Sequence, residues 1–260
     1  GCSSVTAPVE TSAPATAPSL EATPEPSATQ EQSSVNDIQV LNGSRVLTLD
    51  FNSLATDFQS ETLPAVTDSE NAPYWEVLPE YSRVTLEGYP LIQHAMAPQI
   101  YIFPIKELSE INDGAGQIVS TLETLLKSPQ ELPVMPFLPL NNAAQVLHVQ
   151  VQYLDFQNGK GLRYLAWYSQ GIMPVNNYSL IYTYQGITDD GAYYIAAVLP
   201  INHPALPEDE TVTGNEPPEF ASDYPTYLTN IIADLNLQNG GSFFPPLDQL
   251  DALVSSMAIQ

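Results

Sequence analysis

The chain has 260 residues and a formal net charge of −24, because 30 acidic residues are balanced by only six lysines and arginines. This length allows one large domain or two small ones, with a real hydrophobic core. Nucleic acids and anionic lipids bind through clustered Lys and Arg, whereas the six basic residues here are scattered: Arg45, Arg83, Lys106, Lys127, Lys160 and Arg163. The composition argues against both partners, and its acidity is typical of a soluble protein at a cell surface.

Residues 1–36 consist mainly of Ser, Thr, Ala and Pro and contain no aromatic side chain. Such a segment cannot bury enough apolar surface to offset the entropy lost on ordering. We expect a disordered spacer over 1–36 and a single domain over 37–260. No apolar run approaches the roughly 18 residues of a transmembrane helix.

The only cysteine is Cys2, so an intramolecular disulfide is impossible. The start Gly1-Cys2-Ser3-Ser4 resembles the cut site of bacterial lipoproteins, in which a small residue precedes the cysteine that becomes acylated. A Ser/Thr/Pro-rich spacer usually follows in that class. The resemblance implies lipidation at Cys2, export, and membrane anchoring on the extracytoplasmic side of a bacterial membrane. The alternative is a chance free cysteine in a tail.

The first half of the domain predicts short strands and one helix. Segments 44–51, 84–89 and 99–103 have strand-like patterns, and 52–73 is polar and turn-rich. Segment 115–127 carries apolar residues at helical spacing, and Asp113 can cap its start. Three prolines within 131–144 forbid a helix or a central strand there. We expect this segment to be an extended apolar loop that packs across the domain.

The second half predicts four strands and two helices. The strands 145–156, 162–170, 178–187 and 192–200 form two hairpins, with turns at 158–161 and 188–191 in which Gly159 and Gly191 take positive φ. Strand 192–200 is apolar on both faces and should be central. Helices are expected over 224–238 and 247–258. The sequence therefore predicts an α+β fold, a largely antiparallel β-sheet with helices packed on both faces.

Two stretches carry resemblances. Residues 174–201, PVNNYSLIYTYQGITDDGAYYIAAVLPI, resemble uncharacterised lipoproteins of environmental bacteria. The order of elements from about 84 to 258 is similar to the PsbP/Mog1 fold: QIYIFPIKELSEI followed by a helix, two consecutive hairpins and a terminal helix. Members of that group are mostly non-enzymatic accessory or binding proteins. The resemblance implies a binding role and transfers no functional residue.

Local motifs for catalysis are missing from the sequence. His94, His148 and His203 are too far apart to form the close pair usual in zinc sites. The domain has no cysteine, nucleophile elbow or phosphate loop, so we expect no catalytic residue, metal, cofactor or nucleotide. Carboxylate chemistry stays open, although the acidic segment 208–223 is proline-rich and typical of a solvated loop.

Aromatic residues and amides in the later strands are the most suggestive feature. Tyrosine offers a flat apolar face and a polar tip, and with Asn it can form a groove for a sugar or a peptide. The candidate ligand-binding residues are Trp167, Tyr168, Asn176, Asn177, Tyr182 and Tyr184. The alternative is that these aromatics simply fill the core of a sheet.

The leading hypothesis is a lipid-anchored binding or accessory protein without catalytic activity, with a protein or glycan partner. The first alternative is a carboxylate-based hydrolase acting on an envelope or extracellular polymer. A structural or envelope-spacing role is the second.

Overall fold

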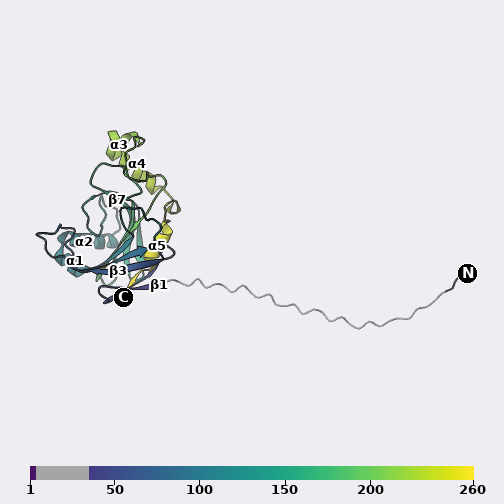
Figure 1. Cartoon of the computed structure of the whole chain (residues 1–260), viewed down its shortest axis with the longest axis horizontal. Coiled ribbons are helices and arrows are strands. Elements are labelled where there is room, and N and C mark those ends of the chain that lie inside the picture. Colours follow the sequence, from purple (N-terminus) through teal and green to yellow (C-terminus); the bar gives the residue numbers. More distant parts are fainter. Residues whose placement is uncertain (4–34) are drawn as a thin grey trace. The chain divides into compact units, whose positions relative to one another are not determined.

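The computed structural model describes residues 1–3 and 35–260. Most of the predicted spacer therefore lies outside the described residues, and its last two positions, Val35 and Asn36, begin a strand. Cys2 is exposed. From residue 35 onwards the described chain forms one compact unit, which contains all the labelled elements of Figure 1.

Seven strands form an antiparallel sheet in the order β3-β4-β5-β9-β8-β7-β6. Their bounds are β3 Asp57–Leu63, β4 Tyr81–Glu87, β5 Gln99–Pro104, β6 Ala144–Phe156, β7 Gly159–Ser169, β8 Ile181–Thr188 and β9 Tyr193–Pro200. The middle position belongs to β9, and all its residues after Tyr193 are buried. The prediction of a central strand with two apolar faces is thus confirmed.

A smaller antiparallel sheet joins the two ends of the domain. Its order is β1-β2-β10, with β1 at Val35–Val40, β2 at Arg45–Asp50 and β10 at Ala258–Ile259. Figure 1 shows β1 and the C-terminus at the same end of the domain. The last residues of the chain therefore hold β2 in place from the side opposite β1.

The described residues contain five α-helices: α1 Ile105–Ile111, α2 Asp113–Lys127, α3 Pro218–Ser222, α4 Tyr224–Asn236 and α5 Leu247–Ser256, with a short 3-10 helix, η1, at Gly240–Ser242. Helix α2 buries an apolar stripe, as its spacing predicts. Its cap is Asn112, whose side chain accepts a hydrogen bond from the Ala115 N–H, and Asp113 is already the first helical residue. No helix in the described ranges has the length and apolar character needed to cross a membrane.

Alternate residues of β7 contribute to two hydrophobic cores. Leu165 belongs to the core that contains Leu250 of α5. Its neighbour Tyr164 belongs to the core that contains Leu122 of α2. The period of two along a strand explains this division, because successive side chains point to opposite faces. The coarse expectation of an α+β fold with largely antiparallel strands is confirmed.

Two local expectations are wrong. Segment 52–73 contains β3, an edge strand whose residues are mostly exposed or half-buried, so pairing with β4 forms it without an apolar pattern. Gly159 lies in β7 without positive φ, and a Cβ there would come 2.1 Å from the Phe156 ring and 2.5 Å from the Ile187 carbonyl oxygen. Close packing, not a turn, requires this glycine. Gly191 does take positive φ, at 69°.

Candidate ligand-binding cleft

The proline-rich segment 134–145, whose last two residues begin β6, is attached to the large sheet by side-chain hydrogen bonds that act in place of strand pairing. Gln185 of β8 accepts a hydrogen bond from the Leu138 N–H at 2.8 Å and donates to the Leu138 carbonyl at 3.1 Å. Gln145 of β6 likewise accepts a hydrogen bond from the Met135 N–H at 2.8 Å and donates to the Met135 carbonyl at 3.2 Å. Proline lacks the N–H of a regular ladder, so these two amides satisfy the backbone groups that the segment buries.

Buried tyrosines complete this attachment. Tyr164 donates to the Pro136 carbonyl at 2.9 Å, and Tyr194 donates to the Gln185 side chain at 2.6 Å. Both tyrosines are fully buried, and burial raises the pKa of each well above its usual value. The hydroxyls therefore stay neutral donors, and the segment is preorganised on the sheet.

Helix α2 and the segment before β4 form the facing wall. Asn112, the cap of α2, donates its side-chain N–H groups to the Tyr74 carbonyl at 2.7 Å and the Val77 carbonyl at 3.0 Å. The backbone of Tyr74 is thereby fixed while its side chain stays 60% exposed. Its ring contacts Trp75 edge to face, with 5.2 Å between the centroids.

A cleft of about 520 Å³ lies between α2, segment 134–145 and Tyr168. No Asp, Glu, Lys or Arg occurs among the described residues that line it. The lining instead combines apolar side chains with hydroxyls and amides, from Tyr74, Gln117, Thr121, Asn141, Gln145 and Tyr168. The chemistry of this lining suits a neutral ligand with hydrogen-bond donors and acceptors.

The polar groups of the cleft differ in how far they are engaged. Tyr168 packs on the Phe137 ring, with centroids 4.7 Å apart, and accepts a hydrogen bond from Gln145 at 2.7 Å. Burial raises the pKa of Tyr168 above its usual value, so its hydroxyl stays neutral. The Gln117 amide and the Tyr74 hydroxyl make no hydrogen bond with other described residues and are open to a ligand.

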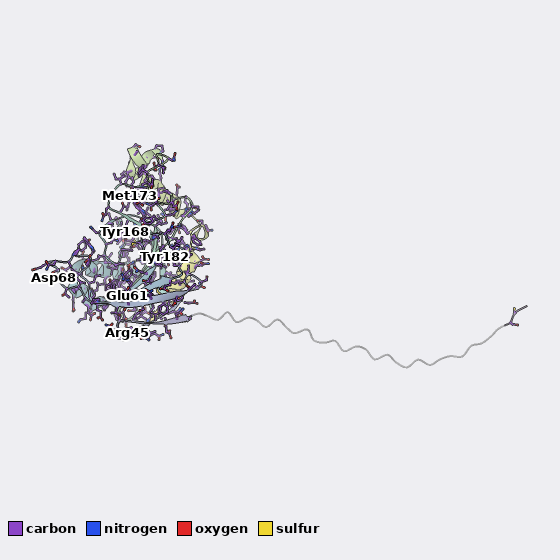
Figure 2. All side chains as sticks on the ribbon, viewed as in Figure 1. Arg45, Glu61, Asp68, Tyr168, Met173 and Tyr182 are labelled. Carbon is purple, nitrogen blue, oxygen red and sulfur yellow. The ribbon has the colours of Figure 1, made fainter. Side chains whose placement is uncertain are left out.

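Of the four aromatic residues predicted for a ligand groove, the cleft contains only Tyr168. Trp167, Tyr182 and Tyr184 are at most 1% exposed. Tyr182, labelled in Figure 2, donates to Asp251 at 2.9 Å, and Tyr184 donates to the Leu154 carbonyl at 2.9 Å. These three side chains fill the core, as the alternative interpretation of the aromatics holds.

The two predicted asparagines do not join the cleft. Asn176 is buried and accepts a hydrogen bond from the Ser179 N–H at 3.2 Å. Asn177 donates to the His203 and Leu206 carbonyls, each at 3.1 Å, and lines a separate hollow beside Tyr178. Their side-chain bonds hold loops together.

The cleft residues that sequence reasoning did not identify are Tyr74, Gln117, Asn141 and Gln145. The one available signal was the proline run, which predicts an extended loop across the domain. That signal does not say which helix faces the loop, because the meeting of α2 with segment 134–145 depends on tertiary packing.

Three ionisable side chains outside the cleft have structural partners. Arg163 and Asp251 form a buried ion pair at 3.1 Å. His94 hydrogen-bonds the Leu180 carbonyl through Nε2 at 2.8 Å, and burial lowers its pKa. In residues 1–3 and 35–260, no group of three or more His, Cys, Asp or Glu side chains could hold a metal ion.

Comparison of the chain with protein-family models, with curated proteins and with solved structures found no match.

Proposed function

We propose that this protein is a lipid-anchored binding or accessory protein, exported to the extracytoplasmic side of a bacterial membrane, and that it binds without catalysing a reaction. Its ligand is an uncharged part of a glycan or of a partner protein. The observation that carries the proposal is the uncharged cleft between α2 and segment 134–145. Ligand sites are typically preformed hollows with a few fixed polar groups among apolar side chains.

Preorganisation supports a binding role for this cleft. The side chains of Gln145 and Gln185 hold Met135 and Leu138 before any ligand arrives. A ligand therefore avoids most of the entropy cost of ordering the loop. A charged ligand would find no counter-charge in the lining, and an anion would also meet the net negative charge of the chain.

The binding experiment places one charge in the cleft. Binding of neutral oligosaccharides and neutral peptides is followed by NMR, and the proposal expects shifts of amides in 114–121 and 134–145. Gln117→Glu should weaken binding at least fivefold, because a bound ligand would desolvate the new carboxylate. A neutral ligand provides no opposite charge to offset that cost. Gln249→Glu, on the exposed face of α5, is the matched control. Equal binding by both variants would refute the cleft as the site.

Anchoring at Cys2 is proposed from the Gly1-Cys2-Ser3-Ser4 resemblance and the Ser/Thr/Pro-rich segment that follows. Two or more acyl chains make membrane attachment stable, at about 0.8 kcal/mol per buried CH₂. In a native bacterial host the protein should partition into the detergent phase, and Cys2→Ser should move it to the aqueous phase. Identical partitioning of both forms would contradict the anchor.

The finer fold assignment is also a proposal. We infer that helices cover both faces of the seven-stranded sheet, as the PsbP/Mog1 resemblance implies. Supporting this, Leu122 of α2 and Leu250 of α5 belong to different hydrophobic cores. An experimental structure with α2 and α5 on the same face would contradict it.

A further inference from the structure

We infer that the ligand is a linear, uncharged oligosaccharide that extends beyond the cleft into two neighbouring hollows. This inference rests on the proposed function and specifies its substrate class. The cleft shares Gln117 and Thr121 with a second hollow, of about 770 Å³, over the exposed side of α2. It shares Tyr74 and Asn141 with a third, of about 410 Å³, which reaches Gln170.

The three adjoining hollows have one chemical character. Among the described residues that line them, Asp113 is the single charged side chain, and hydroxyls and carboxamides supply the remaining polar groups. Hydroxyls donate and accept, and carboxamides carry both functions on separate atoms. A neutral sugar presents hydroxyls of the same dual kind at every ring, so this surface matches a glycan along its whole length.

The exposed side of α2 explains why an extended chain fits better than a single sugar. The hydroxyls of Ser120, Thr121 and Thr124 each donate to the carbonyl four residues earlier, at 2.8–3.1 Å. Their donors are therefore used, while their lone pairs stay free to accept from sugar hydroxyls. These three hydroxyls span roughly 6 Å of helix rise, whereas the whole row of polar side chains in the hollow, from Asp113 through Gln117 to Thr124, spans roughly 16 Å. The polar groups of the hollow are therefore spread over more than one ring.

Tyr74 supplies a stacking surface where the cleft meets the third hollow. Its side chain is 60% exposed, while its carbonyl is fixed by Asn112. A tyrosine ring combines a flat apolar face with a polar tip, which suits the apolar face and the hydroxyl rim of a sugar ring. Because only the backbone of Tyr74 is bonded to α2, the ring can be removed without disturbing the wall.

The backbone around the cleft favours a sugar over an extended peptide. Peptides commonly bind by adding a strand to free backbone groups at a sheet edge. One wall of the cleft is a helix, and in the other the Met135 and Leu138 backbone groups are already bonded to Gln145 and Gln185. The helix and these bonded backbone groups offer a peptide no such ladder.

The test uses an array of neutral linear hexasaccharides built from glucose, mannose, galactose, xylose or N-acetylglucosamine, with hexamers of uronic acids and neutral decapeptides beside them. We expect binding to at least one neutral hexasaccharide and not to the uronic acids. Calorimetry should show that this hexasaccharide binds at least tenfold more tightly than its disaccharide, because the longer chain occupies more than one hollow.

Variants then locate the site. Tyr74→Ala should weaken hexasaccharide binding about tenfold, equivalent to about 1.4 kcal/mol, with an unchanged melting temperature. Tyr178→Ala removes another exposed tyrosine, one that lines a separate hollow, and should leave affinity within twofold. Equal effects of the two variants, or equal affinity for disaccharide and hexasaccharide, would overturn the inference.

Failure of the sugar and failure of the cleft are distinguishable. If a decapeptide binds instead of the sugars and Gln117→Glu weakens its binding at least fivefold, the cleft is a binding site and the glycan assignment is wrong. If neither class of probe binds, both the proposed function and this inference fail.

Discussion

At the scale of single residues, two glycines are required for different reasons: Gly191 for its positive φ and Gly159 for close packing. Gly191 has a φ of 69° and open space around a Cβ, so Gly191→Ala should cost about 1 kcal/mol of folding free energy through backbone strain alone. Gly159 has ordinary φ but faces the Phe156 ring and the Ile187 carbonyl oxygen. Gly159→Ala should therefore cost about 1–3 kcal/mol through overpacking. Urea unfolding measures both losses.

Gly171 provides the control for these substitutions. It has no positive φ, and a Cβ would meet nothing within 4 Å. Gly171→Ala should leave the free energy of unfolding unchanged within about 0.5 kcal/mol. A smaller loss at Gly159 than at Gly171 would contradict the overpacking expected in β7.

The Arg163–Asp251 pair carries the second residue-scale prediction. The two side chains are 6% and 18% exposed, and Tyr182 also donates to Asp251. Asp251→Asn leaves a buried guanidinium without its counter-charge, so we expect a loss of about 3–5 kcal/mol in urea unfolding. The control is Glu123→Gln at the exposed pair with Lys127, 3.9 Å apart, which should cost under about 0.5 kcal/mol.

Burial of His94 should make the free energy of unfolding depend on pH. Burial lowers its pKa from the usual 6.5 in the folded protein, so below about pH 6.5 the unfolded chain takes up the proton first. The free energy of unfolding should therefore fall as the pH is lowered from 7.5 to 5.5. His94→Gln should reduce this slope, and His203, whose pKa is lowered too, should maintain part of it. An unchanged slope would contradict the prediction.

At the scale of elements, segment 134–145 depends on side-chain hydrogen bonds to remain on the sheet. Gln185→Met keeps the volume but leaves the Leu138 backbone groups and the Tyr194 hydroxyl without partners. Each of these three unsatisfied buried groups costs about 1–3 kcal/mol, so we expect a total loss of at least about 3 kcal/mol and faster hydrogen exchange at Leu138. Exposed Gln117→Met should be neutral. A loss below about 1 kcal/mol at Gln185 would contradict this role.

At the scale of the whole molecule, the two chain ends should contribute very differently to stability. Residues 1–34 contain no aromatic side chain, and their only large aliphatic residues are Val5, Val9 and Leu20, so a chain of residues 35–260 should melt within about two degrees of the full chain. Met257 and Ile259 are buried, and Gln260 exchanges backbone hydrogen bonds with Val46. Deleting 257–260 should cost at least about 4 kcal/mol. Calorimetry compares the two truncations, and similar melting temperatures would contradict this difference.

The sequence by itself determined the features that follow from local periodicity. Apolar residues on both faces of 192–200 indicated a central strand, the helical spacing from Ala115 to Lys127 indicated α2, and the turn at Gly191 followed from glycine's freedom of φ. These properties are set by neighbours within a few residues, so the pattern contains them.

Only the tertiary structure decided which distant elements meet. Tyr168 and Tyr182 come from neighbouring strands with similar patterns, yet Tyr168 lines the cleft while Tyr182 is buried against Asp251 of α5. The close approach at Gly159 and the meeting of α2 with segment 134–145 depend on the same long-range packing. The face of a strand follows from its period, but the element that covers that face is chosen by contacts between segments far apart in the chain.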